Sequence, residues 1–444
     1  MNRLRSALDR AHPAIFCTYA GAAAFAAYFS MYAFRKPFTA ATFDDVAGWN
    51  YVLDYKVALV IAQLVGYALS KLAGIRIIAE TGRTGRGVAI LGLVGVSWLA
   101  LLLFALIPAP WNVAALFLNG LPLGLIWGLV FSYVEGRRTS EVLGAILCSA
   151  FIVSSGLVKT VGGWILAAGV SDHWMPAATG ALFLPLLALA VFGLSQLPPP
   201  SPQDEAERIR RAPMSGRDRA AFLGAYGPGV LLLVLAYVLF TAVRDFRDNF
   251  AAEIWAALGH AKAAAMFTAS ELPVAAIALA VLAATMGVRD NRNALLILHA
   301  VIVAGALLLG LSTLAFQLGM MPPLAWMIAS GAGLYMAYTP FNAMLFDRMI
   351  AATGRVGAAG FLIYVADASG YVGSVGLMLL KTFGSLRLDW LNFFILTAYG
   401  AALASVFMVA LSGLYFGARI GEGGTGLSAG NTPETHPETT PFRP

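Results

Sequence analysis

Long apolar stretches alternate with short polar turns along the chain, and twelve of them are long enough to cross a bilayer. A transmembrane helix needs ~20 apolar residues to cover ~30 Å of hydrocarbon, and a helix satisfies its own backbone hydrogen bonds in lipid. We therefore predict an all-α integral membrane protein with 12 transmembrane helices. The predicted spans are 14–35, 56–75, 87–107, 112–134, 141–168, 174–196, 224–243, 263–287, 293–317, 322–346, 356–380 and 390–417.

The spans form two sets of six around one charged, proline-rich segment. This pattern predicts two similar six-helix bundles that rock around a site between them, near the bilayer midplane. The last residues are rich in Gly, Thr and Pro, which predicts disorder. The predicted units are an N-terminal bundle at 1–196, a cytoplasmic linker at 197–223, a C-terminal bundle at 224–417 and a disordered tail at 418–444.

The first span of each set ends in a similar way. Arg35 follows Tyr28 by seven residues, and Arg244 follows Tyr237 by the same spacing. This repeated Tyr–Arg spacing agrees with a duplicated bundle, although aromatic and arginine residues also mark membrane interfaces.

Composition and charge agree with this topology. The chain is 59% hydrophobic and only 12% charged, against roughly 45–50% and about 25% in soluble domains. Lys and Arg gather on alternate turns, and the turns at 108–111 and 318–321 have none. By the positive-inside rule both termini and the linker are cytoplasmic, in an inner (plasma) membrane. The net charge of +6 therefore reflects topology and not nucleic-acid binding.

The sequence offers no chemistry for catalysis or metal binding. Cys17 and Cys148 both lie inside predicted spans, and the five histidines are scattered. We find no HxxxH or CxxC pattern, no Ser/His/Asp set and no phosphate loop, so we expect no enzyme activity, no metal and no cofactor.

Three motifs of the N-terminal half carry a family resemblance. The first span ends with YAFRKPFTAA, from Tyr32 to Ala41; the second contains GYALSK at 66–71, and the fourth contains GLIW at 124–127. The first motif resembles the Tyr-x-x-Arg-Lys-x-Phe-x-x-Ala pattern of the organophosphate:phosphate antiporters. These carriers of glycerol phosphate and sugar phosphates belong to the major facilitator superfamily.

The resemblance implies the major facilitator superfamily fold and a phosphate-bearing substrate held by one basic residue from each bundle. Arg35 would be the first of these residues, and inorganic phosphate would be the exchange partner. The second family arginine directly follows a Tyr-Val-Leu in span seven, where this chain has Phe240 and reaches Arg244 about one turn later. The family's histidine neighbourhood in span five is replaced by Phe151, with Lys159 beyond it.

Charged residues inside the spans are the other candidates, because an ionised side chain at mid-bilayer costs ~2.5–3.5 kcal/mol even on lenient scales. Arg35 either binds an anion with its planar fork or anchors the helix at the interface. Lys159 lies deep in span five. It either binds substrate or forms a structural ion pair.

Asp367 in span eleven has two interpretations. It carries a proton, since burial raises a carboxyl pKa, or it is the counter-ion of Lys159 or Arg35. Spans five and eleven are equivalent in the two halves, which suggests a Lys159–Asp367 pair. Lys71 is either an anchor at the inner end of span two or part of the pathway.

Arg244 stands in the run RDFRD at 244–248. It either faces the cavity opposite Arg35, or the run is an extracellular loop of mutually paired charges. Aromatic side chains either line the cavity as hydroxyl and indole donors or pack at interfaces. They are Tyr32, Tyr67, Trp127, Tyr237 and Tyr364.

Together these features predict a monomeric secondary active transporter that moves a small organic anion, phosphate- or carboxylate-bearing, by alternating access. Arg35 and Lys159 would hold the anion, Arg244 would assist, and Asp367 would compensate charge or carry a proton. The expected partners are a small-molecule substrate, a coupling ion (phosphate or proton) and the lipid bilayer. The alternatives are a transporter-like sensor that binds such a ligand without net transport, and a proton-coupled transporter of a non-anionic solute.

Overall fold

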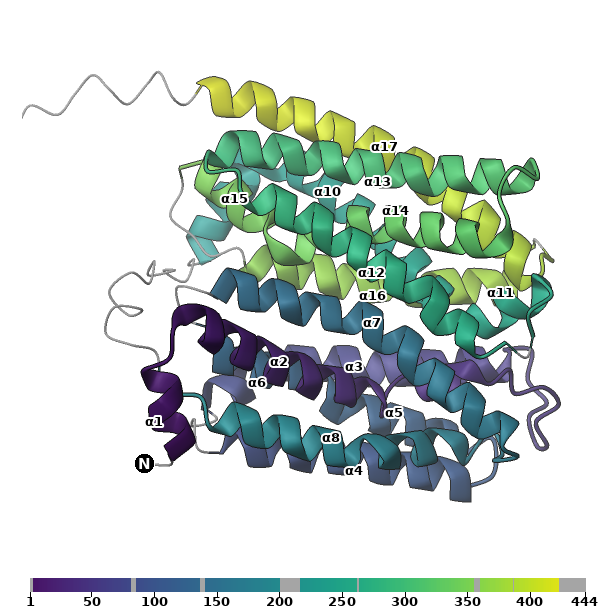
Figure 1. Ribbon diagram of the computed structural model, residues 1–444. Coiled ribbons are helices and arrows are strands. Elements are labelled where there is room, and N and C mark those ends of the chain that lie inside the picture. Colours follow the sequence, from purple (N-terminus) through teal and green to yellow (C-terminus); the bar gives the residue numbers. More distant parts are fainter. Residues whose placement is uncertain are drawn as a thin grey trace, which may run out of the picture.

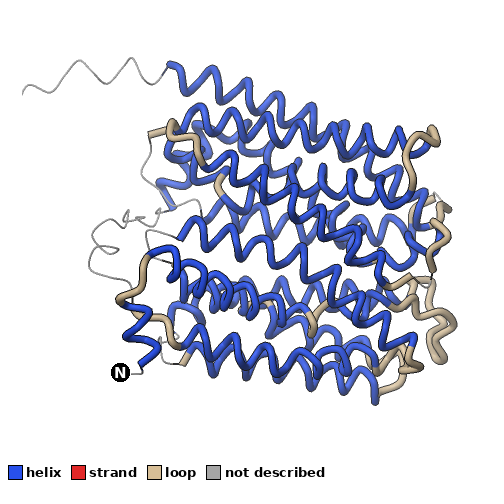
Figure 2. The backbone as a smooth tube through the Cα atoms, viewed as in Figure 1, coloured by secondary structure: helices blue, strands red, loops and turns tan. Residues whose placement is uncertain are grey.

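The computed structural model describes residues 3–80, 85–135, 140–199, 216–261, 263–354, 360–385 and 387–422. Within these ranges the chain is helical, with loops and no strand (Figure 2). The long helices run roughly parallel to one another, and the N-terminal half lies beside the C-terminal half (Figure 1). The first residues and the end of the last helix lie at the same end of the bundle.

Within the described ranges the N-terminal half contains eight α-helices, the first of them short, and one 3₁₀ helix. They are α1 (Arg3–Asp9), α2 (Pro13–Tyr32), η1 (Pro37–Ala40), α3 (Tyr55–Glu80), α4 (Arg86–Leu106), α5 (Val113–Leu123), α6 (Ile126–Val134), α7 (Ser140–Ala167) and α8 (Met175–Ser195). A break at Gly124 and Leu125, next to Pro122, divides the fourth predicted span into α5 and α6.

The C-terminal half repeats this arrangement. Its helices are α10 (Gly216–Asn249), α11 (Ala251–Ala257), α12 (Ala265–Met286), α13 (Asn291–Gln317), α14 (Pro323–Ala343), α15 (Leu345–Ala352), α16 (Gly360–Phe383) and α17 (Trp390–Glu422). Helix α10 begins inside the segment 197–223 predicted as a linker, and α17 continues into the predicted tail. The rest of that tail, 423–444, lies outside the described residues.

The predicted spans all coincide with helices. Among the described residues, ten segments are long and apolar enough to cross a membrane, with α5 and α6 counted together. Helices α3 and α14 are not among these ten. The all-α membrane architecture is confirmed, while the number of twelve crossings stays a prediction.

Local sequence explains where several helices start. Proline stands in the first turn of α2, α8 and α14, where its missing N–H costs nothing. Helix α13 begins after Asp290, whose carboxylate accepts a hydrogen bond from the Asn293 amide at 2.7 Å. Asp389 caps α17 in the same way through Asn392. These caps satisfy amides that the helix itself leaves unpaired.

Glycines bring neighbouring helices into close contact. A Cβ added to Gly66 of α3 would lie 2.3 Å from the Phe117 carbonyl oxygen of α5, and one added to Gly120 would lie 2.2 Å from the Gln63 carbonyl oxygen. Small residues of this kind let helix backbones approach each other in lipid. Helices α13 and α14 meet in the same way at Gly305.

This packing makes Gly120→Val a sensitive test. The new side chain would meet backbone on α3, which cannot move aside as a flexible side chain can. We expect a loss of ~3 kcal/mol, the upper end for overpacking, and a melting temperature lower by several degrees. Gly95→Val is the matched control, because a Cβ there meets nothing within 4 Å. Equal melting of the two variants would contradict the close α3–α5 contact.

The two halves meet mainly along two pairs of helices. Helix α7 packs against α12, and α3 packs against α16. Helix α7 also reaches α14, and η1 touches α11 at the end remote from the termini. The candidate site lies along this boundary.

Candidate functional site

Seven cations and five carboxylates, which we call the boundary charge cluster, lie along or near the contact between the halves. The cations are Arg35, Lys36, Lys56, Lys71, Lys159, Arg244 and Arg247, and the carboxylates are Asp245, Asp248, Glu253, Glu271 and Asp367. They form two levels of ion pairs that join the halves, with two arginines and several tyrosines between them.

Asp248 of α10 is the centre of the first level, at the end remote from the termini. Its carboxylate accepts from Lys36 Nζ at 2.5 Å and from Lys159 Nζ at 2.6 Å. Lys159 also donates to the Asp248 carbonyl oxygen at 2.8 Å, and Ser155 donates to the carboxylate. Both lysines belong to the N-terminal half, so a single carboxylate of the C-terminal half holds two buried cations.

A second pair strengthens this level. Lys56 of α3 donates to both carboxylate oxygens of Glu253 in α11, at 2.6 and 2.9 Å, and to the Thr39 carbonyl oxygen at 2.9 Å. The Thr160 hydroxyl of α7 lies 2.7 Å from the Thr268 hydroxyl of α12. The halves are therefore closed against each other at this end.

The run RDFRD is helical throughout, because α10 continues to Asn249. The alternative that this run is an extracellular loop is therefore wrong. Mutual pairing of its charges holds for one pair and not for the others. Arg247 pairs with Glu271 of α12 at 2.6 Å and donates to the Met327 carbonyl oxygen. Only Arg244 and Asp245 pair within the run, at 2.7 Å.

The second level of ion pairs lies nearer the termini and centres on Asp367 of α16. Lys71 Nζ of α3 lies 2.9 Å from one carboxylate oxygen, and the Tyr237 hydroxyl donates to the other at 2.6 Å. The expected Lys159–Asp367 pair is therefore wrong. Each residue finds a closer partner on another helix, because the two lie at different depths along the boundary.

Between these levels lie two arginines, one from each half. The Arg35 guanidinium carbon is 3.9 Å from the centre of the Tyr67 ring, and that of Arg244 is 4.1 Å from the centre of Tyr338. The Arg35 guanidinium carbon is also 5.8 Å from the centre of the Tyr32 ring. A cation over an aromatic face is stabilised by ~0.5–2 kcal/mol, which offsets only part of the free-energy cost of removing the cation from water.

Arg35 differs from the other cations in its surroundings. No carboxylate among the described residues pairs with it, and its Nε is buried without a hydrogen-bond partner. Arg244, in contrast, keeps Asp245. Arg35 is thus a half-buried cation that tyrosine rings hold in place.

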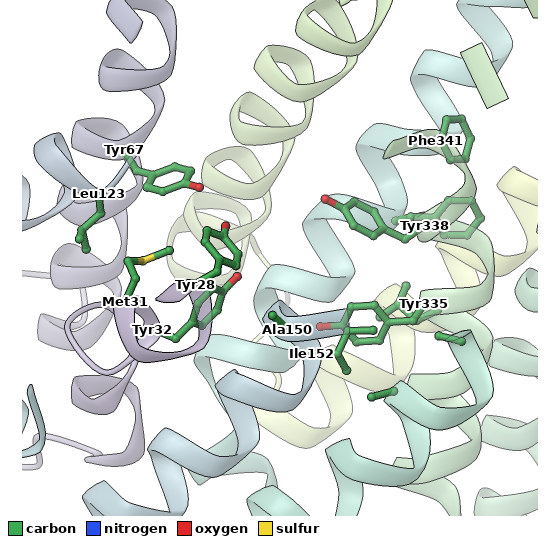
Figure 3. Packing of buried hydrophobic residues seen from close by; sticks show 14 of the residues in the cluster. Tyr28, Met31, Tyr32, Tyr67, Leu123, Ala150, Ile152, Tyr335, Tyr338 and Phe341 are labelled. Carbon is green, nitrogen blue, oxygen red and sulfur yellow. The ribbon is translucent and has the colours of Figure 1, made fainter. Parts of the chain in front are cut away.

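Tyrosines from both halves lie close together at the boundary (Figure 3), and three of them contact the arginines: Tyr32, Tyr67 and Tyr338. Tyr28, Tyr32 and Tyr67 of α2 and α3 face Tyr335 and Tyr338 of α14, and their hydroxyls turn toward the boundary. Hydroxyl groups can donate to or accept from a bound ligand without adding charge.

Most of the aromatic candidates lie in or beside this group. Tyr237 stacks on Tyr338 at 5.2 Å between ring centres. Trp127 packs edge-on against Tyr28 at 5.1 Å, which places it in a second row behind the first. Tyr364, in contrast, is 43% exposed. It precedes Tyr371 by seven residues and so lies on the same side of α16, and its place in the cavity stays a prediction.

Several residues of the group were not expected from the sequence. Lys36 lies in the motif YAFRKPFTAA and Asp248 in the run RDFRD, so the sequence pointed to the surroundings of both residues. Tyr338 and Tyr371 could not be identified from the sequence, because their local sequence does not indicate which side of the helix meets the other half. Among the described residues no group of three or more His, Cys, Asp and Glu side chains could hold a metal ion.

The comparisons with solved structures identify the fold. The chain is similar to a D-xylose–proton symporter at 15% identity, over 90% of this chain and 96% of that one, with a TM-score of 0.60. It is similar to nucleoside transporter NupG at 13% identity, over 89% and 99%, with a TM-score of 0.59. A peptide transporter matches at 15% identity, over 91% and 95%, with a TM-score of 0.58.

The protein is thus a multi-pass membrane protein with the major facilitator superfamily fold. These three neighbours are transporters of a sugar, nucleosides and peptides. The chain belongs to DUF5690, a family of unknown function whose sequence profile matches residues 37–419. No curated protein matches the sequence.

Proposed function

We propose that this protein is a secondary active transporter that moves a small organic anion by alternating access between its two bundles, 1–196 and 224–417. The fold supports transport, since the solved structures of similar fold are sugar, nucleoside and peptide transporters. The charge balance at the boundary supports an anion. In this proposal the membrane is the inner (plasma) membrane, both termini are cytoplasmic and the monomer is the working unit.

The observation that carries the proposal is the excess of positive charge in the boundary charge cluster. Seven cations face five carboxylates, because Arg35 has no acidic partner within the described part of the chain and Asp248 serves both Lys36 and Lys159. Buried charges are costly unless they are paired. A phosphate monoester carries about −1.5 to −2 charges at pH 7, which would neutralise this excess.

Arg35 and Arg244, one from each bundle, would hold such a group from the two sides. A guanidinium presents parallel N–H donors that match two phosphate oxygens, and Tyr32 and Tyr67 add hydroxyl donors. Because each bundle supplies one arginine, the bound anion would draw the bundles together. Lys159 would join it when the Asp248 pair opens.

Alternating access follows from the two levels of ion pairs. The pairs of Asp248 and Glu253 would have to part for the site to open at the end remote from the termini. The Lys71–Asp367 pair would have to part for it to open at the other end. A loaded site reorients more easily than an empty one, whose cations lack a counter-charge. This favours exchange, and inorganic phosphate is the counter-substrate that the resemblance to the organophosphate:phosphate antiporters suggests.

Exchange in proteoliposomes tests the proposal. Vesicles loaded with inorganic phosphate are diluted into labelled glycerol 3-phosphate, succinate or xylose, with protein-free vesicles as the control. We expect uptake of at least one anion that depends on internal anion, and no uptake of xylose. Saturable binding of the anion without flux would instead identify a sensor, and uptake of xylose alone would refute an anion carrier.

A second candidate function is proton-coupled transport of a non-anionic solute. It is favoured by Asp367, a carboxylate that links both halves through Lys71 and Tyr237 and whose protonation would release Lys71. Solute uptake driven by an imposed pH gradient, without internal anion, would support this candidate over exchange.

The Lys71–Asp367 pair gives a prediction of its own. Asp367→Asn leaves the Lys71 ammonium without its counter-charge, and Lys71→Gln leaves the carboxylate alone. We expect each to slow anion exchange about tenfold, in line with ~1.4 kcal/mol per factor of ten. The swapped variant, Lys71→Asp with Asp367→Lys, should recover part of the lost rate. No recovery, with normal folding by gel filtration, would show that the pair itself is not what matters.

A further inference from the structure

A pocket of about 600 Å³ opens in the N-terminal half, at the end of the bundle remote from the termini. Three loops line it: the one after η1, the one between α4 and α5, and the one between α7 and α8. This volume is in the range of small-molecule sites. The pocket is separate from the arginines and tyrosines of the boundary, and the proposed transport mechanism does not use it.

The charged lining residues of this pocket are all acidic. Asp44 and Asp45 come from the first loop and Asp172 from the third, and no lysine or arginine is among the lining residues. His173 also lines the pocket, and burial lowers the pKa of its imidazole below the ordinary value, although the nearby Asp172 opposes this. The ring is therefore mostly neutral near pH 7 and adds no compensating charge.

A buried amide gives an independent sign of a missing partner. Asn112, which also lines the pocket, is fully buried. Neither polar atom of its side chain makes a hydrogen bond of normal geometry within the described part of the chain, although the Tyr55 hydroxyl lies nearby. Buried amides normally have partners, so a ligand that donates or accepts here would satisfy it.

The remaining lining is apolar and aromatic. The Phe43 and His173 rings meet edge-on at 5.5 Å, and His173 stacks on Phe104 at 5.1 Å. Leu106 and Ile107 add aliphatic surface. An alkyl chain would find apolar contact between the carboxylates, and an ammonium group is attracted to an aromatic face.

We propose that this pocket binds a small organic dication of the α,ω-diamine type. The carboxylates come from different loops, and they do not form a group of three close enough to hold a metal ion within the described ranges. Separated negative charges match a ligand whose two ammonium groups are separated by an alkyl chain. A zwitterionic lipid headgroup fits less well, because its phosphate would meet carboxylates and no cation.

Calorimetric titration of the purified full chain tests this site without reference to transport. We expect putrescine to bind saturably at one site, with an affinity that falls as salt is added. The uncharged analogue 1,4-butanediol should not bind. Phosphoethanolamine, which carries the ammonium of a lipid headgroup, should bind at least tenfold more weakly than putrescine.

The key variant is Asp45→Asn combined with Asp172→Asn, for which we expect at least a tenfold loss of putrescine affinity. Asp45 has a φ of 54°, and asparagine tolerates this left-handed region well, so the loop should keep its shape. Each single variant should lose less. Asp389→Asn is the matched control: it removes an exposed charge at the same end and keeps a good helix cap.

Four results would overturn the proposal. Equal binding by the double variant would show that the carboxylates do not form the site. Equal binding of 1,4-butanediol would remove the role of charge. Tighter binding of phosphoethanolamine would assign the pocket to lipid, and displacement of putrescine by an equal concentration of Ca²⁺ would assign it to a metal. A failed transport assay would leave all of these readouts unchanged.

Discussion

Replacing Arg35 by glutamine is expected to abolish most anion exchange, with a rate at least ~100-fold below that of the wild type. The reason is that a guanidinium–phosphate contact is lost and the phosphate oxygens keep no equivalent donor. Hydrogen bonds to charged groups contribute ~1.5–3 kcal/mol each, and ~1.4 kcal/mol corresponds to a factor of ten. Initial rates of labelled glycerol 3-phosphate uptake into phosphate-loaded vesicles would measure the effect.

Folding should not suffer in this variant. Arg35 has no carboxylate partner among the described residues, so removing its charge leaves no orphaned anion. We expect an unchanged or higher melting temperature, which separates loss of binding from loss of structure. Arg35→Lys keeps the charge but not the planar fork, and its rate should be intermediate. Arg10→Gln is the control, because Arg10 is exposed before α2; an Arg35→Gln rate near that of Arg10→Gln would refute the assignment.

Asp248→Asn is expected to open the halves at the end remote from the termini. It leaves Lys36 and Lys159, both nearly fully buried, without their shared carboxylate. Breaking a buried ion pair costs ~3–5 kcal/mol, and this cost falls on the closed form, because both lysines can reach water once the halves part. The population should therefore shift toward the open form by ~100-fold or more.

Thiol labelling measures this shift. Thr160 of α7 is buried against α12 in the closed arrangement, so Thr160→Cys reports whether these helices separate. In a Cys17→Ser, Cys148→Ser background, a membrane-impermeant maleimide should react at least tenfold faster when Asp248→Asn is added. Asp389→Asn, which removes an exposed charge at the same end, should leave the labelling rate unchanged. Equal labelling with and without Asp248 would contradict a closure held by this residue.

The membrane fold could be predicted from the sequence because hydrophobic length is a direct consequence of bilayer thickness. Arg35 and Lys71 could be identified because motifs surround them. Their partners could not be identified: the Lys71–Asp367 ion pair joins residues 296 apart, and the Lys36–Asn249 hydrogen bond joins residues 213 apart. No local pattern reports a contact between two bundles.

Tyr364 shows a second limit. Tyr364, Asp367 and Tyr371 follow the spacing i, i+3, i+7 and therefore lie on one side of α16. The Tyr371 ring lies 5.4 Å from Lys71 Nζ, while Tyr364, about two turns earlier, is exposed. The local sequence can indicate the side of a helix on which a residue lies, but not the depth at which that side meets the other half.

The run RDFRD was ambiguous for a similar reason. Four charges in five residues normally indicate a solvated turn, and here α10 carries them into the protein, where each finds a partner. Arg244 and Asp245 offset each other's charge, whereas Arg247 and Asp248 depend on a glutamate and two lysines from distant segments. Their placement is therefore a property of the assembled halves.

The central claim is that an anion compensates the positive excess between the halves. The most direct test is to compare the binding of glycerol 3-phosphate and of its uncharged parent, glycerol, to the purified protein by calorimetry, in wild type and in Arg35→Gln. We predict saturable binding of the phosphate ester to the wild type only, and no binding of glycerol to either. Binding of the ester with equal affinity to both proteins, or of glycerol as tightly as the ester, would contradict the claim.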